Sequence, residues 1–447
     1  MSGPLPRLGV VLDFGSASPM GVLAAARGMA EIVFLCDRDL PYVRARFDDV
    51  AALAEAVDVT GLPAHTLADR VGGLRLAGIT TFSEHQLNRT AALAQRHGLA
   101  FHDRATARAL TDKYVQRRIL AAAGVQHTAC RVVRGVADLA AAVACVGLPA
   151  VLKPRRGAAS AYTCRVDSVA EAAGRLRDFA GGAAPARPVD FVLEELLVGD
   201  GSVAGPGWAD YVSVESVTSG GVVRHVEITG KFPLAAPFRE TGYVIPSTLD
   251  EAARQAVFDL TTAAVRALGV QHGATHVEVK LGRGGPQVIE VNGRVGGYVA
   301  DLLSRARRVD LVRMALAAAL GRAPDPPADS GYRRHAFQYF LTPPVDAVAL
   351  RSLDGVTALG RRPGIQAVEI LKQPGESVDW RAGTLAYVGI VHGAAEDHRG
   401  VLDLVEMINR TLVIRYDTVG GAAAAPPRPA QPPRPGSSDK TPRDRAI

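Results

Sequence analysis

The segment from Thr275 to Tyr298, THVEVKLGRGGPQVIEVNGRVGGY, constrains the fold more than any other part of the chain. Two apolar runs flank a short Gly-Arg-Gly-Gly connection, a pattern that predicts two antiparallel strands joined by a tight turn. Side chains two residues apart on a strand point to the same face, so we expect Glu290, Asn292 and Arg294 together. Glu278 lies on the partner strand. The segment therefore predicts a hairpin that gathers acidic, amide and basic side chains.

These side chains are of the kind that binds a metal with phosphate. Glu278, Glu290 and Asn292 supply the oxygen ligands that Mg²⁺ prefers, and Arg294 adds a fixed positive charge. For any one of them alone, the solvated face of an amphipathic hairpin is an equally good interpretation. The neighbouring positions are valine and isoleucine, however, and burying carboxylates without a cation costs several kcal/mol. The group therefore favours a bound cation.

Lysine usage gives a second, independent indication. The chain has 51 lysine and arginine residues, of which only six are lysine, and four of those six lie between Lys113 and Lys280. Lys113 is near the start of a helix pattern with Thr111 as the expected N-cap, and Lys153 ends an apolar strand. Lysine is a compact charge that commonly binds phosphate. An exposed surface lysine is the simpler interpretation of each one alone, but their placement ahead of the acidic hairpin favours phosphate binding.

Composition excludes several classes of protein. At 447 residues, the chain is long enough for two or three domains, and 48% hydrophobic with 21% charged residues is typical of a globular protein. No apolar run approaches the ~18 residues needed to span a bilayer, and the N-terminus has no signal-peptide pattern. The four cysteines form no CxxC pair, which fits a reducing cytoplasm and argues against a disulfide framework. We expect a cytoplasmic protein without a membrane partner.

The net charge of +6 does not indicate a nucleic-acid partner. The last 26 residues hold five basic and two acidic side chains, which accounts for half of this charge. The rest of the chain is nearly balanced and has no basic stripe interleaved with aromatic residues. The tail is rich in proline and alanine and is expected to be disordered.

Alternation of strand and helix patterns over residues 7–110 predicts a doubly wound parallel sheet. The first turn has no GxGxxG, so a dinucleotide site there is not supported. We expect four parts: an N-terminal Rossmann-like domain over 1–110, a central domain over 111–325 with a small subdomain at about 125–195, a C-terminal subdomain over 326–420 and a tail over 421–447. The fold class is thus α/β with a two-subdomain core.

The ordered landmarks from residue 1 to about 416 resemble the ATP-grasp superfamily. They are a D-K helix start at Lys113, a strand ending K-P at Lys153, a hinge segment LEELL from Leu193, H-x-E at Glu278 and E-x-N-x-R from Glu290. The segments DYVSVES, ITGKF, FRETGYVIPS and WRAGTLAYVGIVHG are further similar to carboxylate–amine ligases of the L-amino-acid ligase type.

The resemblance implies a role for each matching residue. Lys113, Lys153 and Ser160 would contact ATP phosphates, Glu194, Glu195 and Leu197 would hold adenine, and Asp210 or Asp200 would bind the ribose. Glu278, Glu290 and Asn292 would bind one or two Mg²⁺ (or Mn²⁺) ions, and Arg294 would bind the substrate carboxylate or its acyl phosphate. Lys231 would line the nucleotide pocket, and Glu240, with Thr241 and Tyr243, would face the amine substrate.

The implied activity is ATP-dependent formation of an amide or peptide bond through an acyl phosphate, with release of ADP and phosphate. Small acids and amino acids or peptides are the expected substrates, in natural-product or dipeptide assembly, and a homodimer is compatible with the family. Two departures bear on this expectation: the loop RRGAASAY has one glycine where the family has several, and Tyr243 stands where related ligases have histidine. Two alternatives stay open, a biotin-carboxylase-like enzyme and a nucleotide-binding protein without ligase activity.

Overall fold

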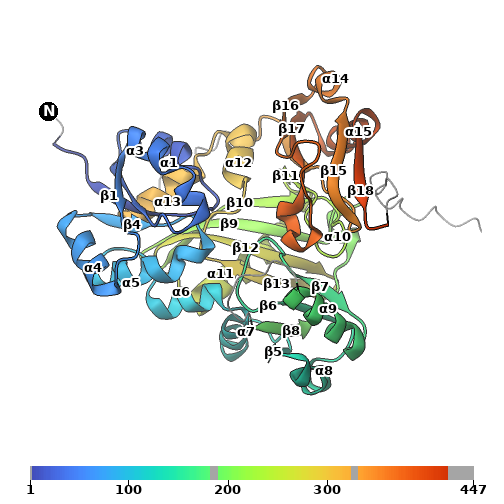
Figure 1. Ribbon diagram of the computed structural model, residues 1–447, viewed down its shortest axis with the longest axis horizontal. Coiled ribbons are helices and arrows are strands. Elements are labelled where there is room, and N and C mark those ends of the chain that lie inside the picture. The colour runs from blue at the N-terminus through green and yellow to red at the C-terminus, as the bar shows by residue number, and fades with distance from the viewer. Residues whose placement is uncertain (1–2, 182–189, 324–330, 421–447) are drawn as a thin grey trace, which may run out of the picture.

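The computed structural model describes residues 3–181, 190–323 and 331–420. The chain forms an N-terminal unit, a central sheet, a small subdomain below that sheet and a C-terminal region at its far end (Figure 1). The predicted tail over 421–447 lies outside the described residues. Among the described helices, none is long and apolar enough to cross a membrane.

The N-terminal unit contains a four-stranded parallel sheet in the order β3-β2-β1-β4. Its strands are β1 (Arg7–Leu12), β2 (Glu31–Cys36), β3 (Glu55–Asp58) and β4 (Gly78–Thr80). Its helices are α1 (Pro19–Ala26), α2 (Pro41–Arg44), α3 (Phe47–Leu53), α4 (Ala64–Gly73), α5 (Leu87–His97) and α6 (Arg104–Thr111), with a 3-10 turn η1 (Glu84–Gln86). Helices bury both faces of a parallel sheet, which is why its strands read as continuous apolar runs. The predicted doubly wound arrangement is confirmed.

One of the helices covering this sheet comes from far along the chain. Leu8 and Val10 pack in one apolar cluster with α1 and with Met314 and Ala318 of α13 (Leu311–Ala319), whereas Val11 and Val33 pack with α4 and α5 on the other face. Periodicity alone gave no reason to place a helix around residue 315 beside the first strand. The contact fixes the N-terminal unit against the central sheet, because α13 also touches β9 and β12.

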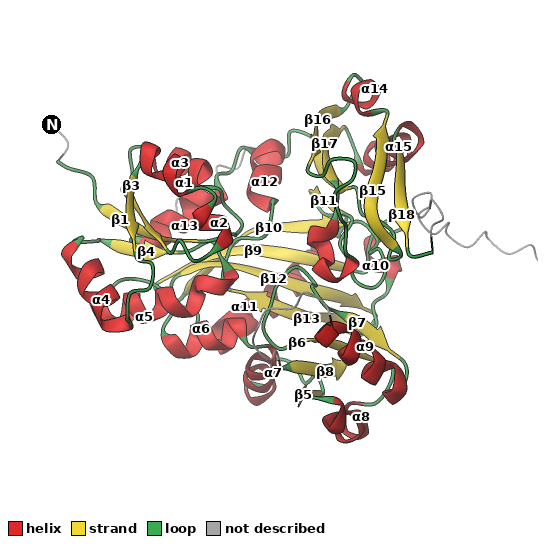
Figure 2. Cartoon of the chain, viewed as in Figure 1, coloured by secondary structure: helices red, strands yellow, loops and turns green. Residues whose placement is uncertain are grey.

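The small subdomain is an antiparallel sheet of order β5-β8-β6-β7, covered by two helices (Figure 2). Its strands are β5 (Cys130–Val133), β6 (Ala150–Pro154), β7 (Cys164–Val166) and β8 (Phe191–Glu195), and its helices are α8 (Leu139–Val146) and α9 (Val169–Gly181), after the 3-10 turn η2 (Val136–Asp138). Helix α7 (Lys113–Ala122) leads into it. Its N-cap is Asp112, whose carboxylate accepts from the Val115 N–H, and not Thr111 as predicted. Thr111 is instead the last residue of α6, and its hydroxyl donates back to the Ala107 carbonyl.

The central sheet has eight antiparallel strands in the order β13-β12-β9-β10-β11-β14-β17-β16. They are β9 (Tyr211–Ser219), β10 (Val222–Lys231), β11 (Gly242–Ile245), β12 (Gly273–Gly282), β13 (Gly285–Asn292), β14 (His335–Phe340), β16 (Ile365–Ile370) and β17 (Gly389–Ala395). The associated helices are α10 (Gly201–Ala204), α11 (Glu251–Ala267) and α12 (Val299–Arg307). The predicted hairpin is present as β12 and β13.

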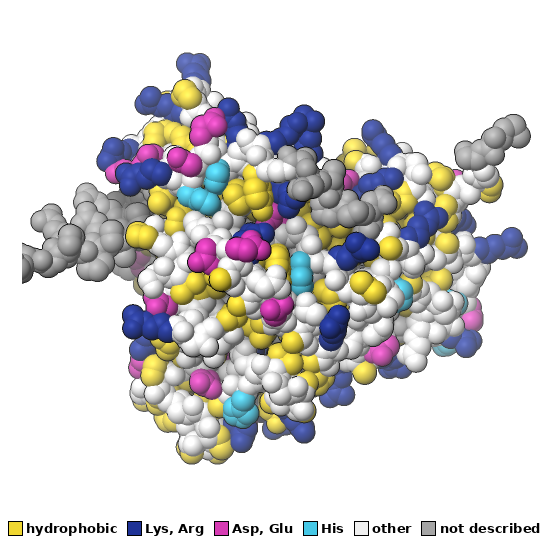
Figure 3. All heavy atoms as spheres, turned by 180° about the vertical axis from the view of Figure 1, so that it is seen from behind, with side chains coloured by type: hydrophobic (Ala, Val, Ile, Leu, Met, Phe, Trp, Pro, Cys, Tyr) yellow, Lys and Arg dark blue, Asp and Glu magenta, His cyan; other side chains and the backbone are white. Residues whose placement is uncertain are grey.

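The C-terminal region adds a two-stranded sheet of β15 (Ala347–Asp354) and β18 (Val413–Thr418), with α14 (Val356–Gly360), α15 (His398–Thr411) and the 3-10 segment η3 (Trp380–Ala386). Strand β14 pairs with β11, β17 pairs with β14 and β16 pairs with β17, so the central sheet includes strands from both sides of the predicted boundary at 325. The domain boundaries stay predictions. On the face opposite that of Figure 1, basic and acidic side chains are interspersed with apolar ones (Figure 3).

Candidate active site

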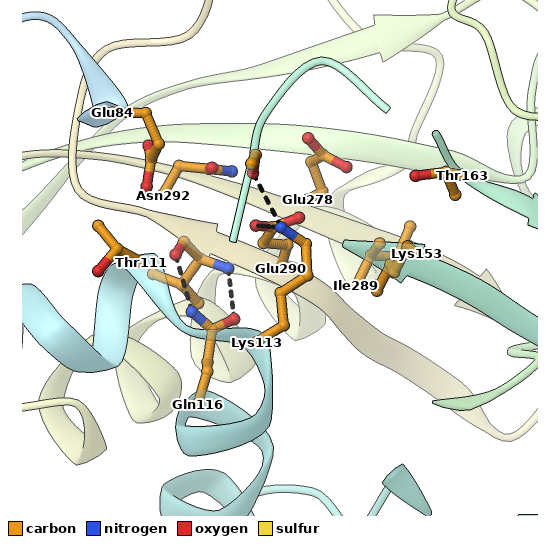
Figure 4. A network of polar contacts seen from close by, with 12 residues as sticks. Glu84, Thr111, Lys113, Gln116, Lys153, Thr163, Glu278, Ile289, Glu290 and Asn292 are labelled. Carbon is orange, nitrogen blue, oxygen red and sulfur yellow. Dashed lines mark hydrogen bonds and ion pairs between the residues drawn. The ribbon is translucent and has the colours of Figure 1, made fainter. Parts of the chain in front are cut away.

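A cavity lies where the central sheet meets the small subdomain. It holds about 990 Å³ of space between atoms, including the part open to solvent, which is within the range of small-molecule sites. Eleven of the predicted site residues line it: Lys113, Lys153, Ser160, Glu194, Glu195, Leu197, Glu240, Glu278, Glu290, Asn292 and Arg294. The predicted residues Asp200, Asp210, Lys231, Thr241 and Tyr243 do not line it. Segments more than 180 residues apart in sequence thus share one cavity. Figure 4 shows Lys113, Glu278, Glu290 and Asn292 close together in this region.

The hairpin presents the three candidate metal ligands on one face. Glu278 and Glu290 are direct cross-strand partners, and Asn292 lies opposite His276. Two like charges placed directly opposite each other repel, so a cation between them would stabilise the strand pair. Among the described residues, no group of three or more histidine, cysteine, aspartate or glutamate side chains encloses a metal. The two carboxylates and the amide oxygen that line the cavity are of the ligand type that Mg²⁺ prefers.

Strand β13 is an edge strand, and side chains hold its free edge in place. Gln116 accepts from the Val291 N–H at 2.8 Å and donates to the Val291 carbonyl at 2.9 Å, as Figure 4 shows, and Gln126 does the same at Val288. These amides replace the hydrogen bonds of a further strand. The backbone between Glu290 and Asn292 is therefore rigidly placed.

Lys113 lies directly beside this strand. Its Nζ is 2.8 Å from Oε1 of Glu290 and donates to the Gly157 carbonyl at 2.9 Å, so it joins the hairpin to the loop that follows β6 (Figure 4). Burial alone would lower the pKa of Lys113, but the attraction of Glu290 outweighs burial and raises that pKa above its ordinary value. The lysine is thus a permanent positive charge at the cavity wall.

Lys153 belongs to a buried ion network centred on Glu194 of the hinge segment, residues 193–197. Its Nζ is 2.5 Å from Glu194, and Arg117 binds the same carboxylate through two hydrogen bonds of 3.1 and 3.2 Å. Burial would raise the pKa of Glu194, but Arg117 and Lys153 together lower it to about 2. Arg117 also donates to the carbonyls of Val288 and Ile289. The carboxylate of Glu194 is therefore engaged by these two cations, while Leu196 and Leu197 of the hinge line the cavity.

A buried histidine, His276, lies beside Glu278, the candidate metal ligand, and keeps it ionised. The Nδ1 of His276 is hydrogen-bonded to Glu215, and its Nε2 is 3.7 Å from Glu278. Burial would lower the pKa of His276, but Glu215 outweighs this and raises it to about 9, so the ring is an imidazolium at neutral pH. The pKa of Glu278 is lowered to about 2 because His276, Lys231 and Arg294 outweigh its burial. Glu278 is therefore ionised.

Arg294 is held by a residue of the N-terminal unit. Its Nε is 3.3 Å from Glu84 of η1, and its NH1 donates to the Val295 carbonyl at 3.1 Å. Burial raises the pKa of Glu84 to about 7, although Arg294 opposes that shift. The pairing orients the guanidinium, and through Glu84 the N-terminal unit contributes one residue to the surroundings of the site.

Glu240 also lines the cavity and has three side-chain partners. Lys231 donates to it at 2.9 Å, the Tyr243 hydroxyl donates to its second oxygen, and the Tyr211 hydroxyl is 3.5 Å away. The Nζ of Lys231 also lies 3.8 Å from the centroid of the Tyr243 ring. Lys231 is fully buried and does not line the cavity, so it acts on the site through Glu240.

Neither candidate for the ribose acid lines the cavity. Asp210 is 2.7 Å from Lys280, which does line it, and Asp200 caps α10 and pairs with Arg283 at the rim of a neighbouring surface pocket. Asp210 thus touches the site through Lys280. The structure does not bring Asp200 to the cavity wall.

Sequence reasoning missed Arg117, Glu84, Gln116 and Glu215. Each acts by holding another site residue, and the contact is made across 61 to 210 positions of sequence, for which single-sequence periodicity contains no signal. Glu215 lies in the DYVSVES segment, which is similar to L-amino-acid ligases. An acidic residue within an apolar strand indicates a buried charge that needs a partner, and this was the sequence signal that could have identified Glu215.

The sequence and the fold are both similar to those of known proteins that contain an ATP-grasp domain. A family model described as an ATP-grasp domain matches residues 146–301. Alanine–anticapsin ligase of Bacillus subtilis is 29% identical over 230 residues, which cover 49% of this chain and 48% of that protein. Carnosine synthase 1 of Homo sapiens is 26% identical over 291 residues, 60% of this chain and 33% of that one. The solved structure of L-amino acid ligase from Bacillus licheniformis superposes with a TM-score of 0.71 at 21% identity, covering 93% of this chain and 100% of that one.

The protein therefore contains an ATP-grasp domain within the fold of an L-amino acid ligase. Its sequence is distantly similar to alanine–anticapsin ligase and to carnosine synthase. The matched regions span about half and one third of the lengths of those two enzymes.

Proposed function

We propose that the protein is an ATP-dependent carboxylate–amine ligase that joins an amino acid or related acid to an amino acid or peptide. The observation that carries this proposal is the single cavity that combines two lysines, a cross-strand pair of glutamates, an asparagine and a fixed arginine. Such a set suits a triphosphate at one end and a carboxylate at the other. The distant relatives that form amide bonds support the choice of amines as acceptors.

The proposed reaction has two steps. A carboxylate oxygen of the donor acid bonds to the γ-phosphorus of ATP, the bond from that phosphorus to the β,γ-bridging oxygen breaks, and ADP leaves. The nitrogen of a neutral amine then bonds to the acyl carbon, the bond between that carbon and the phosphate oxygen breaks, and inorganic phosphate leaves while the nitrogen loses a proton. The products are an amide, ADP and phosphate.

The side chains of the cavity contribute position and charge. Lys113 and Lys153 would attract the phosphates, and Arg294, held by Glu84, would face the donor carboxylate and its acyl phosphate. Magnesium held by Glu278, Glu290 and Asn292 would supply charge neutralisation on the transferring phosphoryl group. These site assignments are part of the proposal.

The acceptor end of the cavity is assigned to Glu240. Its carboxylate lines the cavity beside Tyr211, Leu234 and Phe238, and it accepts from Lys231. A carboxylate so placed would attract the ammonium form of an amine and accept its proton on the way to the neutral nucleophile. The apolar neighbours would contact the acceptor side chain.

The test is a matrix of donor acids against amine acceptors with ATP and MgCl₂, followed by phosphate release and by mass spectrometry of the products. We expect at least one pair to give one amide per phosphate and per ADP. Phosphate release with bicarbonate alone would support the biotin-carboxylase-like alternative. Tight ATP binding without phosphate release from any pair would support the nucleotide-binding alternative.

An Arg294→Lys variant tests the assignment of Arg294 to the donor site. It keeps the charge but loses the planar fork that binds a carboxylate through two parallel hydrogen bonds. We expect a raised KM for the donor acid with ATP affinity unchanged. An unchanged donor KM would remove Arg294 from the donor site.

A further inference from the structure

The loop after β6 has a backbone conformation that needs outside support. Ala159, Ser160 and Tyr162 all have positive φ, at 57°, 54° and 53°, although none is glycine. Such residues persist in this region only when their surroundings hold them there. Residues 157–161 of this loop line the cavity, and the Gly157 carbonyl accepts from Lys113, so the loop has to be held in this conformation for the cavity to keep its wall.

The support comes from residues 379–387 of the C-terminal region, here called the clasp segment. The Tyr162 N–H donates to the Arg381 carbonyl at 2.9 Å, and the Thr384 N–H donates to the Ala159 carbonyl at 2.8 Å. Two backbone hydrogen bonds thus join the loop to a segment more than 200 residues further along the chain. These bonds hold the loop at the cavity wall.

Gly383 is the point of closest approach between the two segments. It has a φ of 66°, and a Cβ there would lie 2.1 Å from the Ala159 carbonyl oxygen and 2.6 Å from the Ala161 nitrogen. No side chain fits that space without moving the loop backbone. Glycine at 383 is therefore required for the closed loop.

Aromatic packing adds a second layer to the same junction. The ring centroid of Trp380 is 6.2 Å from that of Phe179 in α9, and Phe179 is 5.3 Å from Tyr162. The guanidinium of Arg175 lies 5.7 Å from the Trp380 ring. The clasp segment thus holds the helix of the small subdomain as well as its loop.

The other side of the clasp segment reaches the acceptor end of the site. The Glu240 N–H donates to the Thr384 hydroxyl oxygen at 3.2 Å, and the Tyr387 hydroxyl is 2.6 Å from that of Tyr298, in the loop that follows Arg294. One residue, Thr384, thus binds the phosphate loop through its backbone and the Glu240 backbone through its side chain.

We propose that Gly383 and Thr384 are positioning residues that couple closure of the phosphate loop to placement of the acceptor carboxylate. The proposal rests on the proposed ligase function. An acyl phosphate is hydrolysed when water reaches it, so the loop has to exclude water while Glu240 holds the amine. Because Thr384 binds both the loop and the Glu240 backbone, the acyl phosphate would form only when Glu240 is already in position for the amine.

The test separates the two contacts of Thr384 and measures the ratio of amide formed to phosphate released. Thr384→Val keeps the backbone N–H and the shape but removes the oxygen that Glu240 needs, and Thr384→Ser restores that oxygen. We expect several-fold less amide per phosphate and a raised acceptor KM in Thr384→Val, with both values near wild type in Thr384→Ser. Equal ratios in all three proteins, at unchanged Tm, would overturn the coupling.

Gly383→Ala tests the loop contact without depending on activity. We expect its Tyr162 amide to exchange with deuterium at least tenfold faster than in the wild type, while the Leu152 amide in β6 keeps its rate. Unchanged exchange at Tyr162 would overturn the role of the clasp segment. If the wild type forms no amide with any acid and amine, the ligase proposal fails, and the exchange result still decides whether the clasp segment holds the loop.

Discussion

Replacement of Glu194 by glutamine tests whether the ion network under the hinge is what joins the small subdomain to the rest of the site. Glu194 is 3% exposed, and its two oxygens accept from Arg117 and Lys153. Glutamine has the same shape but no charge. The variant therefore leaves two buried cations, from α7 and from β6, without the anion that lies between them.

The magnitude follows from the pKa of the carboxyl group. Its pKa is lowered from 4.5 to about 2, and because one pKa unit is worth about 1.4 kcal/mol, the ionised group stabilises the fold by about 3 kcal/mol. The loss expected when one partner of a buried ion pair is removed is about 3–5 kcal/mol, which agrees. We expect the Glu194→Gln variant to be less stable than the wild type by about 3 kcal/mol at pH 7.

The sign of the pH dependence provides a sharper test. The folded-state pKa is depressed, so the stabilisation is fully present above pH 4.5 and is lost as the pH falls from 4.5 towards 2. A protonated glutamate resembles glutamine, so the difference between the two proteins should shrink over that range. Urea unfolding followed by circular dichroism at pH 7, 5 and 3.5 measures this difference, with m-values compared to check that the same surface unfolds.

Glu195→Gln is the matched control, because the neighbouring carboxylate is exposed and accepts from the Ala129 N–H at 3.1 Å. It should lose no more than about 1 kcal/mol at any pH. A Glu194→Gln variant as stable as Glu195→Gln at pH 7 would refute the reasoning. So would a difference from the wild type that stays constant down to pH 3.5.

The remaining predictions concern the hairpin and the lysine beneath the hinge. Glu290→Ala should abolish ATP-dependent phosphate release while leaving the circular dichroism spectrum unchanged, and a Mg²⁺-dependent, active variant would rule out the metal assignment. Lys153→Ala should weaken ATP binding by about 1–3 kcal/mol in calorimetry, and unchanged affinity would exclude Lys153 from the phosphate site. The pKa of His276 is raised to about 9 because Glu215 outweighs its burial, so its stabilisation of about 3 kcal/mol is present below pH 6.5 and is lost as the pH rises through 9. Thermal unfolding at pH 7 and 9.5 should show a smaller loss in His276→Gln than in the wild type, and equal losses would contradict the imidazolium assignment.

The sequence was most informative where function depends on local spacing. The hairpin was predictable because a period of two and a glycine-rich turn are local properties, and they placed Glu278, Glu290 and Asn292 on one face. The N-terminal parallel sheet was predictable for the same reason. The N-cap of α7 was wrong by one residue, because Thr111 and Asp112 both have capping side chains and only the end of α6 decides between them.

The residues that hold the site were not predictable in this way. Glu84 reaches Arg294, and Thr384 reaches both Ala159 and Glu240, through contacts that exist only once separate units have packed together. Their local patterns are those of an ordinary turn and an ordinary C-terminal loop. No periodicity in one sequence records which distant element lies on the other side of a cavity.

The sequence by itself determined which side chains are available and which faces of the strands present them, because these depend on backbone geometry within a few residues. Only the tertiary structure decided that lysines 113 and 153 and the hairpin surround one cavity, and that the clasp segment binds the loop at its wall. It also decided the charge states of the buried groups, since a pKa depends on the burial and the neighbours that packing creates.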